Sequence, residues 1–230
     1  MTGLGTAVAR PAGAALAAAT GALARLRHRR PFHTRGVLLD ATLVVAEDEA
    51  GAVSVPQGRK EALARLSLSA GLPRGLPDVV GLAVRWTEDG APQDVLFSSS
   101  GHGRLTRFAL VPRRTLLGGW FSTIMPLRAP HGPVVLALRP DAMVTRVTGV
   151  VTLEVLEATP LGPWRRFGAL ELHGPAAGAS RDGDDPGLRF DPTRDAPRRL
   201  GTYAWEDRLR APGYAAARRE SRSDRDRDQS

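Results

Sequence analysis

The chain has 230 residues and no cysteine, which excludes disulfide scaffolds, thiolate metal sites and cysteine nucleophiles. A chain of this length buries roughly 70% of the surface that its unfolded form exposes, so one domain can form a complete core without a covalent or metal staple. The net charge is +8, from 32 basic and 24 acidic residues. Composition alone identifies no activity.

The surplus of positive charge is concentrated at the N-terminus. Residues 1–39 contain six arginines and no acidic residue. Such a segment can contact nucleic acid or an anionic membrane. It has few aromatic residues for base stacking and no nucleic-acid-binding motif, so we do not expect a nucleic-acid partner. We interpret residues 1–28 as a basic, alanine-rich arm.

Residues 11–24 are apolar but consist mostly of alanine, and this stretch is too short to span a bilayer. The arginines that follow, at 25, 27, 29 and 30, oppose its use as a signal peptide. The pattern predicts a weakly amphipathic helix. We therefore expect a cytoplasmic protein, and weak peripheral contact of residues 10–30 with a membrane surface stays open.

From residue 36 onward the pattern is typical of strands. Apolar or alternating runs occupy residues 37–45, 79–86, 95–98, 105–111, 134–138, 144–155 and 166–173, with Gly, Pro and charged turns between them. One short helix is expected at residues 57–64. Seven or eight strands favour an antiparallel β-barrel with a few accessory helices, an α+β fold.

The C-terminal part of the chain has a different composition. Residues 174–198 are rich in Gly, Asp, Pro and Arg and predict a long surface loop. The pattern of residues 202–219 predicts one or two helices with a break at Pro212. Residues 220–230 form an Arg/Asp/Ser tail that we expect to be disordered. The expected organisation is an arm (1–28), a barrel domain (29–219) and a tail (220–230).

Two short segments carry candidate chemistry. His33 lies between Arg30 and Arg35, just before the first expected strand. Arg65 and Ser67 are two residues apart, so on an extended segment their side chains share a face. A serine run at residues 98–100 beside a histidine is compatible with hydrolysis, but no Gly-x-Ser-x-Gly elbow is present.

Four motifs, in this order, resemble those of the haem-dependent catalases. Residues 30–36 (Arg-Pro-Phe-His-Thr-Arg-Gly) match the family's Arg-x-x-His-x-Lys-Gly with Arg in place of Lys, and residues 65–67 (Arg-Leu-Ser) correspond to Arg-Phe-Ser. Residues 78–86 correspond to an Asp followed by Gly-Phe-Ala-Val-Lys-Phe, and residues 94–99 to Asp-Leu-Val-Gly-Asn-Asn. The resemblance covers about residues 29–110, and a catalase is considerably longer.

The resemblance implies a haem b cofactor. Its distal side would use His33 as the group that accepts and returns the peroxide proton, with Ser67 orienting the imidazole. Arg30 and Arg65 would pair with the haem propionates, because guanidinium groups suit carboxylates.

The proximal ligand of the haem iron is implied to be Tyr214. Arg210 precedes it at the family's Arg-to-Tyr spacing, with Pro in place of Phe between them. An arginine one helical turn before a tyrosine holds the phenolate charged. Tyr203 is the alternative ligand.

One departure from the family pattern affects the expected reaction. Ser98 stands where the family has its distal asparagine, and a hydroxyl reaches less far than an amide. We therefore expect peroxidase or organic-hydroperoxide chemistry rather than fast peroxide dismutation. The alternative is a catalase-like barrel without haem that serves as a binding module or as a hydrolase such as a phosphodiesterase. Oligomerisation is left open.

Overall fold

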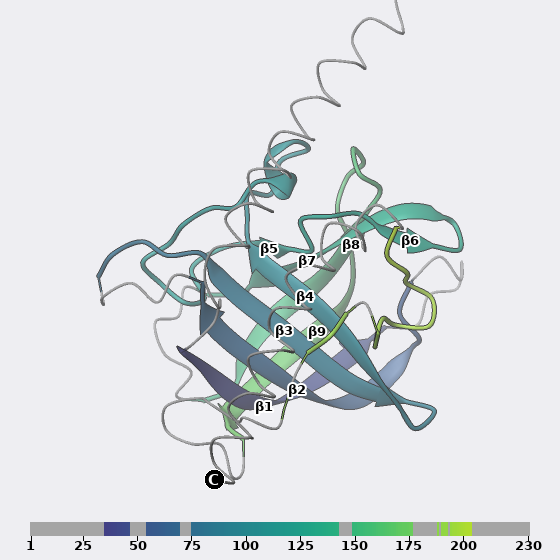
Figure 1. Cartoon of the computed structure of the whole chain (residues 1–230), viewed down its shortest axis with the longest axis horizontal. Coiled ribbons are helices and arrows are strands. Elements are labelled where there is room, and N and C mark those ends of the chain that lie inside the picture. The colour runs from purple at the N-terminus through teal and green to yellow at the C-terminus, as the bar shows by residue number, and fades with distance from the viewer. Residues whose placement is uncertain are drawn as a thin grey trace, which may run out of the picture. The chain divides into compact units, whose positions relative to one another are not determined.

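The structure is a computed structural model that describes residues 35–46, 54–69, 75–142, 149–176, 188, 190–192 and 194–203 (Figure 1). Within these ranges no helix has both the length and the apolar character needed to cross a membrane. The expected arm, the expected helices beyond residue 203 and the expected tail lie outside the described residues. The same holds for residues 144–148 of the expected strand 144–155, and the observed strand begins at Val151.

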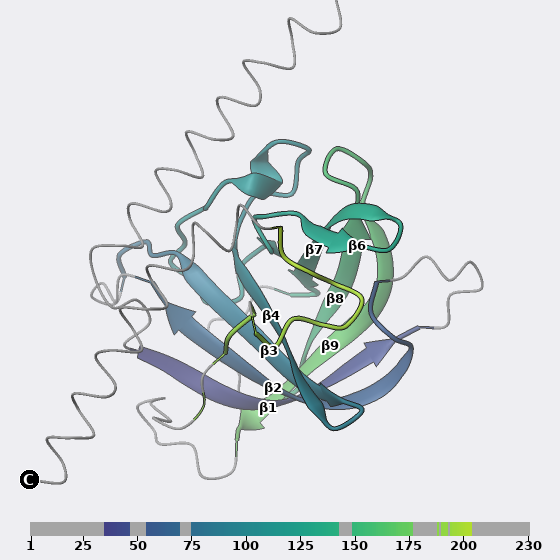
Figure 2. The same cartoon turned by 45° about the vertical axis from the view of Figure 1, so that its right-hand side comes forward.

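Antiparallel strands form the framework of the described structure. They are β1 (Arg35–Val45), β2 (Gly58–Leu68), β3 (Val80–Glu88), β4 (Ala91–Ser99), β5 (Phe121–Ser122), β6 (Leu127–Ala129), β7 (Gly132–Pro140), β8 (Val151–Ala158) and β9 (Arg165–Pro175). The sheet order is β5-β4-β3-β2-β1-β9-β8-β7-β6, and β5 also pairs with β7. Eight strands therefore close into a barrel, and β6 extends it as a hairpin with β7 (Figure 2). The expected antiparallel barrel is confirmed.

The alternation of side chains along β2 shows how the barrel wall is divided. Ala62, Ala64 and Leu66 are buried in the core, where small alanines leave room for larger side chains. Those core side chains include Trp86, Phe97, Phe121 and Phe167. The residues between them on β2 point to the outer face, because successive side chains of a strand alternate.

The prediction of a short helix at residues 57–64 is wrong, because residues 58–64 of this stretch belong to β2. Its Lys, Glu, Ala and Leu residues are good helix formers in isolation. Pairing with β1 on one side and β3 on the other, together with burial of every second residue, overrides that local preference.

The prediction of a strand at residues 105–111 is also wrong. The segment contains a 3₁₀ turn, η1 (Thr106–Phe108), which is the one helical element of the described ranges. Arg107 explains the turn, because its buried side chain donates to the carbonyl oxygens of Gly103, Thr159 and Gly162. An extended segment would not direct this guanidinium back to Gly103.

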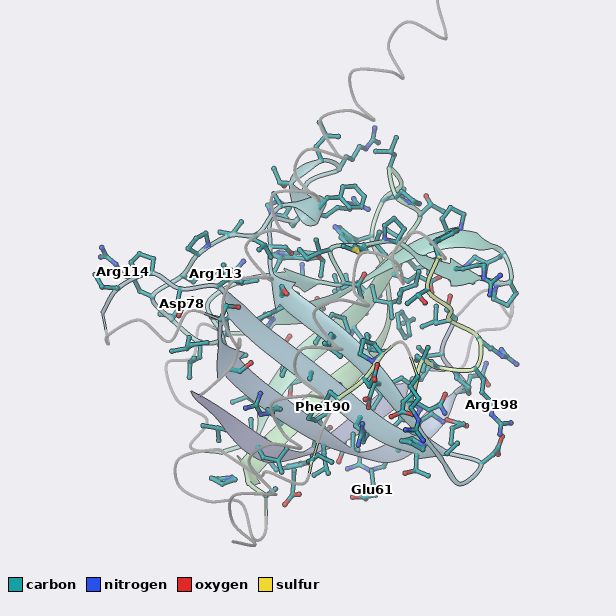
Figure 3. The ribbon with its side chains drawn as sticks, in the orientation of Figure 1. Glu61, Asp78, Arg113, Arg114, Phe190 and Arg198 are labelled. Atoms are coloured by element: carbon teal, nitrogen blue, oxygen red, sulfur yellow. The ribbon has the colours of Figure 1, made fainter. Side chains whose placement is uncertain are left out.

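The segment expected to be a surface loop is partly anchored to the barrel. We name residues 190–192 and 194–201 the strap; Figure 3 labels two of them, Phe190 and Arg198. The backbone of Asp191 donates to Oδ2 of Asp94 at 2.6 Å, and the backbone of Arg198 donates to Gln93 Oε1 at 2.9 Å. Leu200 is buried in the core. The strap is therefore an irregular but anchored part of the fold.

Candidate functional site

Four small residues line up across the outer face of the first four strands. Gly36 on β1 pairs with Ser67 on β2, Ser67 pairs with Gly81 on β3, and Gly81 pairs with Ser98 on β4. Directly paired residues of neighbouring strands share a face of the sheet. We call these four residues the small-residue row. No side chain longer than serine rises from it, so the row forms a shallow, flat strip on the barrel wall.

Arg65 lies in the adjacent row of the same face. It pairs with Leu38 on β1 and with Ala83 on β3. Its guanidinium group reaches diagonally to Gly36: a Cβ at position 36 would lie 3.1 Å from Arg65 Cζ and 2.9 Å from the carbonyl oxygen of Leu66. Because Gly36 has no side chain, the Arg65 guanidinium group can occupy the space above it.

Three of the expected site residues thus lie on one face. Ser67 and Ser98 belong to the same row with Gly81 between them, which separates their strands by about 10 Å. Arg65 is in the next row of β2. Ser67 is buried and Ser98 is half-buried.

The remaining expected site residues lie outside the described residues. They are Arg30, His33, Arg210 and Tyr214. Tyr203, the alternative iron ligand, is described and is half-buried after the strap.

Ser99, in the serine run at the end of β4, has a structural role. The Ser99 hydroxyl donates to the carbonyl oxygen of Val111 at 2.8 Å and accepts from the backbone of Val80 at 3.1 Å. The ring of His102 stacks on Trp120, with 5.4 Å between ring centroids. These contacts join the strand end to the following loop, and the Ser99 hydroxyl proton is donated to the backbone.

A buried ion pair occupies the far end of the same outer face. Nε and Nη2 of Arg85 each donate to a carboxylate oxygen of Asp94 at 2.6 Å, and the Asp94 side chain has no exposed surface. The hydrogen bond to Asp94 raises the pKa of Arg85 above its ordinary value, against an opposing effect of burial. Asp195 of the strap adds a second carboxylate at 3.4 Å.

This pair was not among the predicted site residues, although the sequence carries a signal for it. Arg85 and Asp94 are opposite charges in two neighbouring strands, and such residues often pair across an antiparallel ladder. Phe190 lies under the guanidinium group, with 5.1 Å from Cζ to the ring centroid. The pair holds the strap against β3 and β4.

Comparison with known proteins identifies the class of fold. No family model matches the chain, and no curated protein sequence matches it. A bacterial catalase structure is similar, with a TM-score of 0.54 and 12% identity over 82% of this chain and 59% of that chain. Catalase A from Saccharomyces cerevisiae is similar with a TM-score of 0.54 and 12% identity over 83% of this chain and 63% of that chain.

The fold is therefore a catalase-like β-barrel. The chain spans less than two thirds of the length of either catalase chain.

Proposed function

We propose that this protein binds haem b against the small-residue row and reacts with hydrogen peroxide or an organic hydroperoxide. The observation that carries the proposal is the position of Ser67 and Ser98 in one row of small residues, with Arg65 beside it. The catalase-like barrel and the order of the four sequence motifs add support.

The described residues suit a flat macrocycle that carries two carboxylates. A planar ring needs a strip of wall without protruding side chains, and the row offers only glycine and serine. A carboxylate at the ring edge needs a cation, and the Arg65 guanidinium lies at the edge of the strip, across Gly36. When bound, haem would supply the redox chemistry that cleaves a peroxide bond.

The chain's own residues would move the proton and orient the substrate. We assign His33 as the base that accepts a proton from the peroxide and returns it to the leaving oxygen. Its position three residues before Gly36 in the chain supports this assignment. Ser67, which pairs with Gly36, would orient the imidazole through its hydroxyl.

Ser98 determines the proposed substrate preference. A serine hydroxyl donates one hydrogen bond on a short side chain, whereas an amide offers two donors and a longer reach. Hydrogen peroxide would be held less firmly than by an asparagine. A peroxidase reaction, or one with an organic hydroperoxide, fits this residue better than rapid dismutation.

The proximal ligand in this proposal is Tyr214, assisted by Arg210. Tyr214→Phe removes the phenol oxygen and keeps the ring, so it should abolish the spectrum of tyrosinate-bound iron. Loss of that spectrum in Tyr203→Phe instead would transfer the ligand role to Tyr203 and leave the haem proposal intact.

Haem titration of the full chain tests the function. Saturable appearance of a Soret band, followed by formation of an oxidised iron species on adding peroxide, is the expected result. His33→Ala should keep the Soret band and lose the reaction with peroxide. Absence of a saturable band would favour the alternative of a haem-free barrel that acts as a binding module or hydrolase.

A further inference from the structure

Two neighbouring loops form one rigid surface at the end of the barrel. They are residues 101–110 and residues 159–164, which we call the loop pair. Arg107 joins them, because its Nη1 donates to Thr159 O at 3.2 Å and its Nη2 to Gly162 O at 2.9 Å. Figures 1 and 2 both show η1 and the β8–β9 loop side by side.

Each loop exposes one leucine at its tip. Leu105 is 74% exposed and Leu161 is 61% exposed, although burial of a leucine side chain is favourable by roughly 1.5–3 kcal/mol. Because Arg107 joins the two loops, both leucines are presented at the same end of the barrel. Trp164 follows the second tip and donates from its indole nitrogen to His102 O at 2.7 Å, which adds a further tie between the loops.

The surface around these leucines is basic. On the first loop Arg104 is exposed, whereas the Arg107 side chain is buried. Burial lowers the pKa of Arg107, and the nearby charge of Arg104 lowers it further. Arg165 and Arg166, the first residues of β9, follow Trp164 directly, and their side chains are 47% and 60% exposed. An anionic partner therefore complements the loop pair.

The aromatic rings of the loop pair are already in contact with one another or with arginines. Trp120 lies between His102 and Trp164, at 5.4 Å and 5.6 Å between ring centroids. Arg107 Cζ lies 4.2 Å from the ring centroid of Trp164, and Arg139 Cζ lies 5.5 Å from that of Trp120. Base stacking on a single-stranded nucleic acid needs free ring faces. The arrangement therefore disfavours nucleic acid as the anionic partner.

We propose that the loop pair docks on an anionic lipid surface. Leu105 and Leu161 would enter the boundary between headgroups and acyl chains, since exposed aliphatic tips gain free energy there. The amphipathic indole of Trp164 would lie at the headgroup level, where tryptophan is enriched. The exposed residues Arg104, Arg165 and Arg166 would contact lipid phosphates, and each such cation adds to the attraction of an anionic leaflet.

Vesicle co-sedimentation of the full chain tests this site. The vesicles are phosphatidylcholine alone and phosphatidylcholine with phosphatidylglycerol. The double variant Leu105→Ser/Leu161→Ser should bind the anionic vesicles roughly tenfold or more weakly than the unchanged protein, because both inserted side chains are lost. The matched control is Val150→Ser, which removes a 65% exposed side chain at the other end of β8 and should bind unchanged.

Exposed leucines contribute little to folding, so the thermal unfolding midpoints of the variants should agree and the comparison stays valid. Arg104→Gln should also weaken binding, and added salt should weaken it for every variant. Equal vesicle binding by the double variant and by Val150→Ser would overturn the proposal, even if other parts of the chain bind lipid. Tighter binding to a single-stranded oligonucleotide, lost in Arg104→Gln but kept in the leucine variant, would overturn it as well.

Discussion

The guanidinium group of Arg65 lies across Gly36 on the neighbouring strand, so the first strand of the barrel and the candidate propionate-binding arginine depend on each other. Glycine is required here by space rather than by its backbone angles. A larger residue at position 36 would contact the Leu66 carbonyl oxygen, which belongs to the strand and cannot move freely.

Gly36→Ala should destabilise the barrel and displace the Arg65 side chain. The added methyl group would lie 2.9 Å from Leu66 O, and overpacking of this kind costs about 1–3 kcal/mol. Chemical denaturation measures the loss. Gly149→Ala is the control, since among the described residues beyond its chain neighbours no atom lies within 4 Å of its added Cβ, and its free energy of unfolding should change little. Equal stability of the two variants would contradict this account of Gly36.

Asp94→Ala should cost about 3 kcal/mol in the free energy of unfolding, because it leaves the partly buried Arg85 without its bidentate partner. The strap should also become accessible to protease, since the Asp191 backbone loses its acceptor. Asp89→Asn removes the exposed carboxylate partner of Arg198 but keeps a side chain that tolerates the φ of 48° at this turn, so it should change stability by less than about 0.5 kcal/mol. A strap that stays resistant to protease in Asp94→Ala would show that other contacts hold it.

The sign of the pH dependence follows from the pKa of Arg85. Because the folded state raises this pKa, the contribution of the Arg85 charge is fully present below the unfolded pKa of arginine and is lost only as the pH rises through the still higher folded value. Arg85 therefore adds no pH dependence to stability in the neutral range.

The barrel could be predicted from sequence because alternating apolar runs report which residues face a core. Strand β2 could not be predicted in this way. Its Lys, Glu, Ala and Leu residues favour a helix locally, and only pairing with two neighbouring strands makes them a strand. The juxtaposition of Ser67 with Ser98 depends on register across three strands, which no local pattern contains. Asp94 anchors the strap through a hydrogen bond to a residue about one hundred positions away in the sequence. No local sequence pattern predicts this contact either.

Arg65→Ala should release haem more readily than the unchanged protein, because a propionate would lose its guanidinium partner. Transfer of haem to an excess of apomyoglobin measures the dissociation rate. The control is Arg59→Ala on the same strand and face, six residues or about 20 Å away, whose partner is Glu171. Identical dissociation rates for these two variants would remove Arg65 from the haem site.

The central claim is that haem lies against the small-residue row, and the haem affinity of Ser98→Leu tests it most directly. The added isobutyl group would rise from the row beside Gly81, where a flat ring has no space for it. The control is Thr87→Leu, an exposed position on the outer face of β3 away from the row. In a Soret titration, the account predicts roughly a tenfold or greater loss of affinity for Ser98→Leu and none for Thr87→Leu, with similar unfolding midpoints. Equal affinity of the two variants would contradict it.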